Sequence, residues 1–266
     1  MELSRRVALE GVQLDEAHER IAIQGVSTPA PKASTGAAAR AGGGSRRPGG
    51  NRDSLEITVS FTIIIKKARM TERDAALDAA NAWAAIAADG AWMTYSGKPG
   101  KRIRVYLDEP ASLGDAREAG KTFTVKFRAY GVPYWEDETA ASVTLADGSY
   151  ATGSLSVGGN ARTVAGAYIL NISGAVMQTL IVQCGSSAFR LTGLAAGAGS
   201  AVIIDHNPEG LLIIRVLEAG GTVRSVLGRR EADSSDDLYV SPGMAAVSVS
   251  ADRAVRATFT ARGRWL

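Results

Sequence analysis

Apolar and polar residues alternate along several segments of the chain, which is the pattern of β-strands with one buried face. The segment 55–65 shows it most clearly, because Ile57, Val59 and Phe61 fall on one face and serine or threonine falls on the other. The same alternation recurs at 102–107, 123–128 and 253–262. The chain is therefore predicted to be mainly β.

Residues 201–217 hold two apolar, β-branched runs on either side of a short polar segment. Asn207 precedes Pro208, so it is pushed out of the helical region and favours a turn. Gly210 can adopt the positive φ that closes a hairpin. We predict a hairpin with both runs deep in a sheet. Turn chemistry alone accounts for its polar residues, including His206.

One segment has the period of a helix instead. Apolar residues recur at helical spacing at Leu77, Ala80, Trp83, Ala84 and Ala87. This predicts one helix at 71–89 with a stripe packed on a sheet. Thr71 and Asp74 have the spacing of a capping box, and Gly90 is a suitable stop. Trp83 is expected in the core rather than at a ligand site.

Residues 27–53 contain three prolines, six glycines and almost no large apolar residue. Such a composition cannot bury a core and predicts a long loop. A loop of this length is usually either functional or disordered, and both readings stay open. Its arginines are candidate interface residues: Arg40, Arg46, Arg47 and Arg52.

The segment 130–138 combines Gly, Pro, aromatic and acidic residues and indicates a domain boundary. We predict domains at 1–137 and 138–266. After the boundary, short strands follow one another with a turn about every ten residues, which is typical of a sandwich or barrel.

The bulk composition adds few constraints. A formal net charge of +3 over 266 residues is too weak to predict nucleic-acid binding. Cys184 is the single cysteine and is expected as a buried thiol in a strand. The first residues lack the apolar core of a signal peptide, and no segment is long and apolar enough to suggest a membrane span.

Residues for catalysis are scarce. The two histidines, His18 and His206, are far apart and have no metal-ligand spacing. Nucleophile-elbow and phosphate-loop motifs are not found in the sequence. Neighbouring acids such as Asp108 and Glu109 are more typical of solvated turns than of a glycosidase pair. We predict no catalytic residues, no cofactor and no metal.

Two strands carry basic residues on their polar faces: Arg102, Arg104, Lys126 and Arg128. Such residues usually form a solvated surface. Alternatively, a cluster of them on one sheet face binds an acidic partner. We retain them as candidate interface residues.

The order of these segments resembles the distal tail protein (Dit) family of siphophages, the bacteriophages with long, non-contractile tails. The N-terminal half presents an early hairpin, the long loop, the strand at 55–63, the helix bearing Trp83, the basic strand at 101–106, and a strand ending in Pro133, Tyr134 and Trp135. In the C-terminal half the similar pieces are 153–157, the strand end at Asp205, 240–243 and 256–264.

The resemblance implies a mainly β protein of two domains: an N-terminal, β-sandwich-like tube domain with one α-helix, and a C-terminal galectin-like β-sandwich. It also implies a structural virion protein that forms a hexameric ring at the distal end of the tail. That ring is a baseplate hub that connects the tail tube to the tail tip and the host-adhesion apparatus. The protein would be made in the host bacterial cytoplasm.

The implied partners are other copies of the chain, the tail tube protein, the tape measure protein, a tail-associated lysin or tip protein, and receptor-binding proteins. Neither a membrane nor a specific nucleic acid is among them. The sequence lacks the His, Asn, Arg and Trp set of sugar-binding galectins, so lectin activity is not implied. The alternative interpretation is a carbohydrate-binding two-domain β module without catalysis, but the second half is poor in aromatic platforms.

Overall fold

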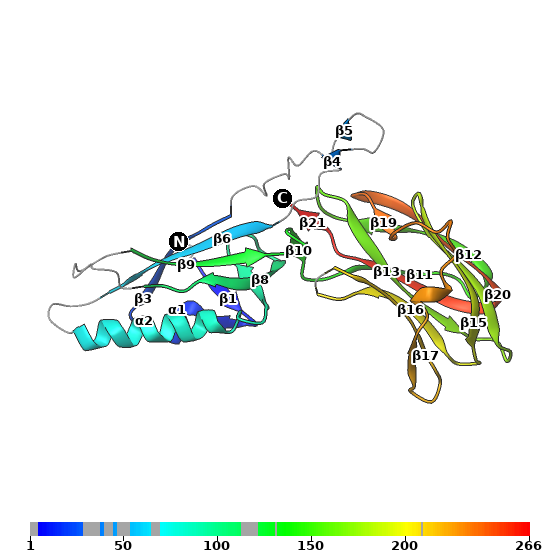
Figure 1. Ribbon diagram of the computed structural model, residues 1–266, viewed down its shortest axis with the longest axis horizontal. Helices are drawn as coiled ribbons and strands as arrows, with labels where there is room; N and C mark the ends of the chain where they lie inside the picture. The colour runs from blue at the N-terminus through cyan, green and yellow to red at the C-terminus, as the bar shows by residue number, and fades with distance from the viewer. Residues whose placement is uncertain are drawn as a thin grey trace. The chain divides into compact units, whose positions relative to one another are not determined.

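The computed structural model describes residues 5–28, 38–39, 45–46, 54–64, 70–112, 122–130, 132–208 and 210–266. The chain divides into two compact units. Unit 1 is Met1–Trp135 with Leu266, and unit 2 is Glu136–Trp265. Both are built mainly from strands (Figure 1), so the prediction of a mainly β, two-domain protein is confirmed.

Unit 1 is one twisted sheet with a helix on one face. Its strands run in the order β2-β1-β7-β8-β9-β6-β3, and β4 pairs separately with β5. The elements are β1 (Val7–Leu9), β2 (Val12–Gln13), α1 (Leu14–Ala17), β3 (Ile21–Ser27), β4 (Ala38–Ala39), β5 (Ser45–Arg46), β6 (Leu55–Ile63), α2 (Met70–Ala85), β7 (Ala91–Tyr95), β8 (Lys101–Glu109) and β9 (Thr122–Ala129).

The core of unit 1 lies between this sheet and α2, which runs along one face of the sheet in Figure 1. Alternate residues of β6, β8 and β9 are buried, as the strand pattern predicts. Trp83 is 2% exposed, and its ring meets Phe127 edge-on at 5.8 Å. Its indole Nε1 donates to the Val12 carbonyl at 2.8 Å. Trp83 is thus a core residue.

Two local predictions for unit 1 need correction. The helix spans Met70–Ala85 rather than 71–89, and turns occupy 86–89 before Gly90, where φ is +89°. Thr71 is therefore already helical and is not an N-cap, while Asp74 accepts a hydrogen bond from Arg73 at 3.1 Å. Most of the predicted loop at 27–53 lies outside the described residues, and the part of it that the structure describes includes the β4–β5 pair.

The short helix α1 was not anticipated, because its charged sequence suggested a turn. Leu14 is fully buried and fixes this turn of helix against the core.

Unit 2 is a sandwich of two sheets. Its elements are β10 (Trp135–Asp137), β11 (Ala141–Thr144), β12 (Gly148–Val157), β13 (Thr163–Asn171), β14 (Met177–Cys184), β15 (Ser187–Ala196), β16 (Ala201–His206), β17 (Leu212–Leu217), β18 (Val223–Ser225), η1 (Leu227–Arg229), β19 (Tyr239–Val240), β20 (Gly243–Ala261) and β21 (Arg264–Trp265).

The long strand β20 belongs to both sheets. Up to Ala251 it pairs with β12 and β14, and from Val255 onward it pairs with β11 and β13, apart from a single β12 pair, Gly148–Val255, where the layers meet. One layer is therefore β12-β20-β14-β15, and the other is β11-β20-β13-β16-β17-β18. Where β20 changes layers, the Asp252 carboxylate accepts from the amides of Gln178 and Thr179 at 3.1–3.2 Å.

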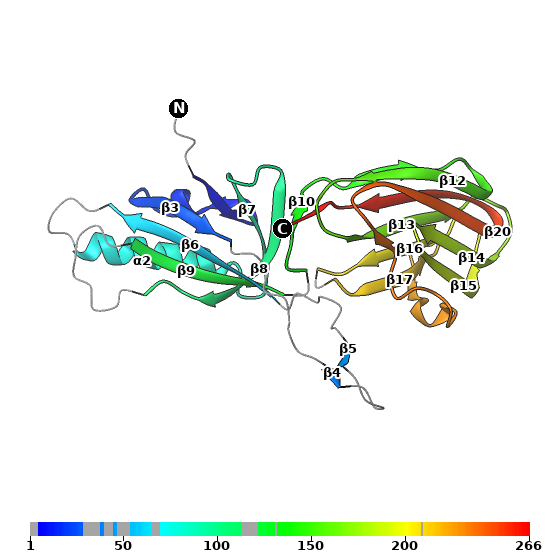
Figure 2. The same ribbon diagram turned by 90° about the horizontal axis from the view of Figure 1, so that it is seen from above.

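The apolar residues between the two layers form one core, which includes Leu155, Val182, Leu191, Ile204 and Phe259. Cys184 belongs to the same core and is fully buried, as predicted. Figure 2 shows β12 at the rim of unit 2 with β20 beside it.

Candidate interaction surfaces

We first consider metal binding, membrane spans and the single thiol among the described residues. Across them, no three His, Cys, Asp or Glu side chains are placed to hold a metal ion. In that same part of the chain, helices fall short of the length and apolar content needed to cross a membrane. Burial raises the pKa of the Cys184 thiol to about 11, so this thiol is not a nucleophile at neutral pH.

The four basic residues predicted on β8 and β9 share the face of the sheet opposite α2, because paired residues of neighbouring strands point to the same side. We call this surface the basic face: Arg102, Arg104, Lys126 and Arg128. Its two halves have different surroundings. The β9 half lies between β6 and the end of β8, and the β8 half lies beside β7.

Acidic residues neutralise the β9 half. Lys126 Nζ lies 2.8 Å from Glu109, and Arg128 lies 2.8 Å from Asp108 and 3.8 Å from Glu56. These hydrogen bonds and charges raise the pKa of both basic groups. The acids were expected in a solvated turn. They instead end β8 and pair across the ladder, because β8 continues to Glu109.

The β8 half is organised around an aromatic ring. The Arg102 guanidinium carbon lies 3.9 Å from the centroid of Trp92, and that of Arg104 lies 5.9 Å from it. Trp92 pairs directly with Arg104 in the β7–β8 register. A guanidinium over an indole face is stabilised by the ring quadrupole, so positive charge is held on the sheet surface here. The contact of Trp92 with these arginines depends on the β7–β8 register and was not predicted from the sequence.

The other candidate arginines cannot be placed in the same way. Arg40, Arg47 and Arg52 lie outside the described residues. The backbone of Arg46 is in β5 and pairs with Ala38.

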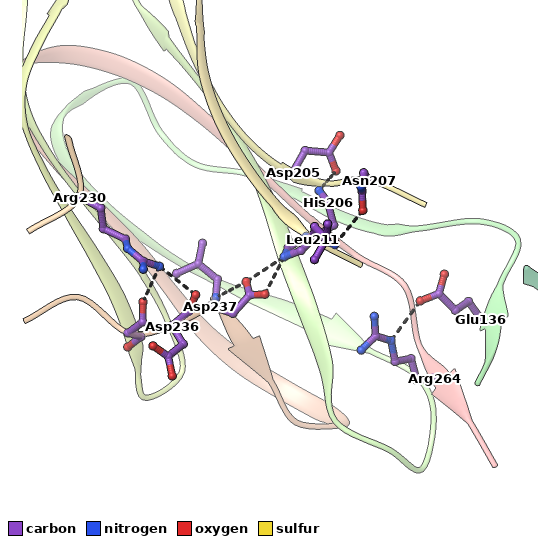
Figure 3. Close-up of polar contacts among 11 residues, drawn as sticks. Glu136, Asp205, His206, Asn207, Leu211, Arg230, Asp236, Asp237 and Arg264 are labelled. Atoms are coloured by element: carbon purple, nitrogen blue, oxygen red, sulfur yellow. Dashed lines mark hydrogen bonds and ion pairs between the residues drawn. The ribbon is translucent and has the colours of Figure 1, made fainter. Parts of the chain in front are cut away.

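The hairpin predicted at 201–217 is confirmed as β16 and β17. Figure 3 shows the side chains of its turn. The Asn207 side chain accepts from the Leu211 amide at 2.8 Å, and Gly210 has a φ of +82°. β16 is largely buried, but β17 is only half buried and Leu211 is 65% exposed. The expectation that both runs lie deep in a sheet was therefore wrong for the second run, which lies next to the short edge strand β18.

His206 has a partner that turn chemistry does not explain. Its Nε2 lies 2.8 Å from both carboxylate oxygens of Asp237, and the two side chains are only 11% and 13% exposed (Figure 3). Asp237 also accepts from the Leu238 amide at 2.7 Å. The partners are 31 residues apart, so no local pattern could have paired them.

Asp237 belongs to a segment that we call the strap, residues 226–240. At one end the Val226 amide donates to the Ile214 carbonyl at 2.9 Å. In the middle, the Glu231 and Ser235 amides donate to β15. The Arg230 guanidinium donates to the carbonyls of Ser235 and Asp236 (Figure 3), and β19 pairs with β13. The strap thus joins both layers of the sandwich, with His206–Asp237 as its side-chain anchor.

A second set of polar contacts lies where unit 2 begins and ends. Arg264 lies 3.0 Å from Glu136, with both side chains 13% exposed (Figure 3). The Trp265 indole donates to Asp137 at 2.8 Å. These contacts hold β21 beside β10. They explain the acidic residues of the predicted boundary as structural partners.

The whole chain was compared with known proteins. No protein-family model matches it, and no curated protein does. Among solved structures, the crystal structure of the Dit protein of phage SPP1 matches with a TM-score of 0.66 and 13% identity, over 98% of this chain and 99% of that chain. It is described as a paradigm of the hub adsorption apparatus in phages that infect Gram-positive bacteria. Two chains from the phage P2 baseplate match over 97% of this chain, with TM-scores of 0.47 and 0.45 and identities of 7% and 8%.

The chain is therefore a two-domain β protein with the fold of a phage hub protein. The particular fold is that of the SPP1 Dit protein, and the likeness extends over both units. The resemblance that the sequence suggested is confirmed at the level of fold.

Proposed function

We propose that the chain is a structural protein of a phage tail. It is a distal tail protein that forms a ring, hexameric as in the family it resembles, and connects the tail tube to the tail tip and host-adhesion apparatus. The observation that carries this proposal is the full-length likeness to the SPP1 Dit protein, which includes both units and leaves almost no residue of either chain unmatched.

The two parts have separate roles in this proposal. The domain at 1–137 closes the ring and contacts the tail tube. The galectin-like domain at 138–266 faces the adhesion apparatus. The partners are other copies of the chain, the tube protein, the tape measure protein, a lysin or tip protein, and receptor-binding proteins. The chain acts as a scaffold at the distal end of the virion tail, without catalysis or a cofactor.

The basic face of unit 1 is our candidate for a ring contact. The residues of this face that we propose to meet a neighbouring subunit are Arg102 and Arg104, because both guanidinium groups lie beside the Trp92 ring. Arginine beside an aromatic ring is a frequent composition at protein interfaces. Arg40, Arg46, Arg47 and Arg52 remain proposed interface residues on sequence grounds.

Imaging of the purified full-length chain by negative-stain electron microscopy, together with light scattering, tests the proposal. We expect closed rings, because heterologous interfaces whose rotation closes form rings. Their mass should correspond to about six subunits, as in the family that the chain resembles. A monomer that binds glycans at every protein concentration would support the carbohydrate-binding alternative instead.

A charge reversal locates the contact. Arg104→Glu places an acid on the basic face and should reduce the fraction of chains in rings. Arg253→Glu is the matched control, because Arg253 is an exposed arginine of unit 2. Circular dichroism should show that both variants fold. Equal ring yields from the two variants would remove the basic face from the proposed contact.

A further inference from the structure

The strands at the edges of the sheets are protected to different degrees. An edge strand exposes unpaired N–H and C=O groups, which natural proteins usually cover or interrupt. In unit 1, the edge strand β3 has an irregular register at Ile23–Gly25, and the Arg5 side chain donates to the Gln24 carbonyl. In unit 2, β11 and β18 are only four and three residues long.

The edge strand β15 is covered by the strap. The Glu231 amide donates to the Arg190 carbonyl, and the Ser235 amide donates to the Ala188 carbonyl, both at 2.9 Å. The hydroxyl of Ser235 in turn accepts from the Ala188 amide at 3.0 Å. This edge of the first layer is therefore occupied from within the chain.

The opposite edge of the same layer is β12, which is long and which no other segment of the described chain covers. Within the described part of the chain, β12 pairs only with β20, in a continuous register from Tyr150 to Val157. It contains no charged residue and no proline, and the uncharged stretch extends from Gly148 to Ala161. A long, regular and uncharged edge is suited to pair with another strand.

We propose that β12 pairs antiparallel with β12 of a second copy of this chain, about a two-fold axis at Ser154. This contact is independent of the proposed ring. It joins the four-stranded layers of two copies into one continuous sheet. Such an isologous contact requires the strand to be complementary to itself.

The side chains of β12 are complementary to themselves in this register. On the buried side, Gly153 is opposite Leu155 and Ala151 is opposite Val157, so a small residue meets a larger one in each pair. On the exposed side, Thr152 is opposite Ser156 and Ser154 is opposite itself. Hydroxyl pairs of this kind stabilise neighbouring strands.

The charged residues that flank β12 are already engaged within their own chain. Asp147 precedes the strand and lies 2.7 Å from Arg256, and Arg162 follows the strand with its guanidinium 4.0 Å from the centroid of the Tyr239 ring. In the register centred on Ser154, neither residue is opposite a like charge of the second copy. One strand pair buries little area, so the association should depend on protein concentration.

The introduction of a charge at the two-fold position tests the proposal on the full-length chain. In Ser154→Lys two lysines face each other, so light scattering should show a twofold lower mass than for the parent chain at the same concentration. Ser154→Glu should behave identically. Mixing the two variants should restore the parent mass, because lysine then faces glutamate. Gln183→Lys is the control, since Gln183 is exposed on the interior strand β14 of the same layer.

Cysteine cross-linking tests the register. Directly opposed residues have Cα atoms about 4.5–5.5 Å apart, which a disulfide can bridge. Ser154→Cys should form a covalent dimer under mild oxidation. Thr152→Cys should not cross-link with itself, but it should cross-link with Ser156→Cys in a mixture. A parent mass that does not change with concentration, or a Ser154→Cys chain that stays monomeric on oxidation, would overturn the proposal, whether or not rings form.

Discussion

The two units place their charges differently. In unit 1, neighbouring strands carry opposite charges on one sheet face: Glu56 on β6, Lys126 and Arg128 on β9, and Asp108 and Glu109 on β8. In unit 2, β12, β13 and β14 contain no charged residue. One of its least exposed polar pairs, His206–Asp237, instead joins a strand to the strap.

The difference shows two ways of specifying a sheet. A one-residue slip in unit 1 would separate the ion pairs and expose the buried face, so the strands themselves specify their register. In unit 2, the change of layer in β20, the tight turns and the strap specify the arrangement. The uncharged strands of unit 2 can pack on both sides without burying a charge. The same lack of charge leaves the edge of β12 without a group that would repel the strand of another chain.

The largest expected effect is the loss of a core aromatic ring. Trp83→Ala removes the contact with Phe127 and the hydrogen bond to Val12. It should lower the free energy of unfolding of unit 1 by about 3–5 kcal/mol. Differential scanning calorimetry should show one transition moving to lower temperature, while the transition of unit 2 stays in place.

The matching change in unit 2 is Phe259→Ala, since Phe259 is fully buried in the sandwich core. It should move the other transition by a similar amount. If either variant moved both transitions together, the two units would unfold cooperatively. The claim that each unit specifies its own sheet would then be wrong.

The strap should be the next most sensitive feature. Asp237→Asn keeps the shape of the side chain but removes its negative charge. The carboxylate of Asp237 faces His206 and accepts a hydrogen bond from the Leu238 amide. Loss of a nearly buried, charge-assisted contact should cost about 3 kcal/mol of unit 2 stability. Denaturant unfolding measures it. Asp236→Asn is the control on the adjacent exposed residue and should change stability by less than about 0.5 kcal/mol.

The alternating strands, the hairpin turn and the core position of Trp83 could be predicted from sequence, because each depends on residues close together in the chain. The ends of α2 could not be predicted, because Thr71 looked like a cap but is already helical. The contacts of the basic face and of the strap were predicted only in part. Pairing Lys126 with Glu109 requires the β8–β9 register, and pairing His206 with Asp237 requires the path of the strap.

The buried thiol of Cys184 tests how strongly the core of unit 2 disfavours a charged group. Burial raises its pKa from 9.0 to about 11. Between these values the unfolded chain loses the thiol proton while the folded chain keeps it, so the free energy of unfolding falls as pH rises. Two pKa units correspond to about 2.7 kcal/mol, and we expect a loss of about 2 kcal/mol between pH 9 and 11. Well below pH 9 the thiol is protonated in both states and contributes no pH dependence.

Cys184→Ala isolates this effect from the titration of lysine and tyrosine residues. It should be less stable than the parent at neutral pH because of the cavity, yet it should lose less stability above pH 9. Parallel pH profiles for the two chains, measured by urea unfolding, would show that the folded unit 2 accommodates a thiolate.

The smallest expected effect concerns the exposed ion pairs of unit 1. Lys126→Met or Glu109→Gln breaks one pair in the ladder and should lower the unit 1 midpoint temperature by only about 1–2 °C, because exposed pairs are well solvated. Added salt should remove the difference, since it screens exposed charges. The double variant should be no worse than either single variant. If one substitution instead destabilised unit 1 as much as Trp83→Ala, a single pair would control the register. A small, salt-sensitive loss means that the register depends on the ladder of charges acting together with the buried face.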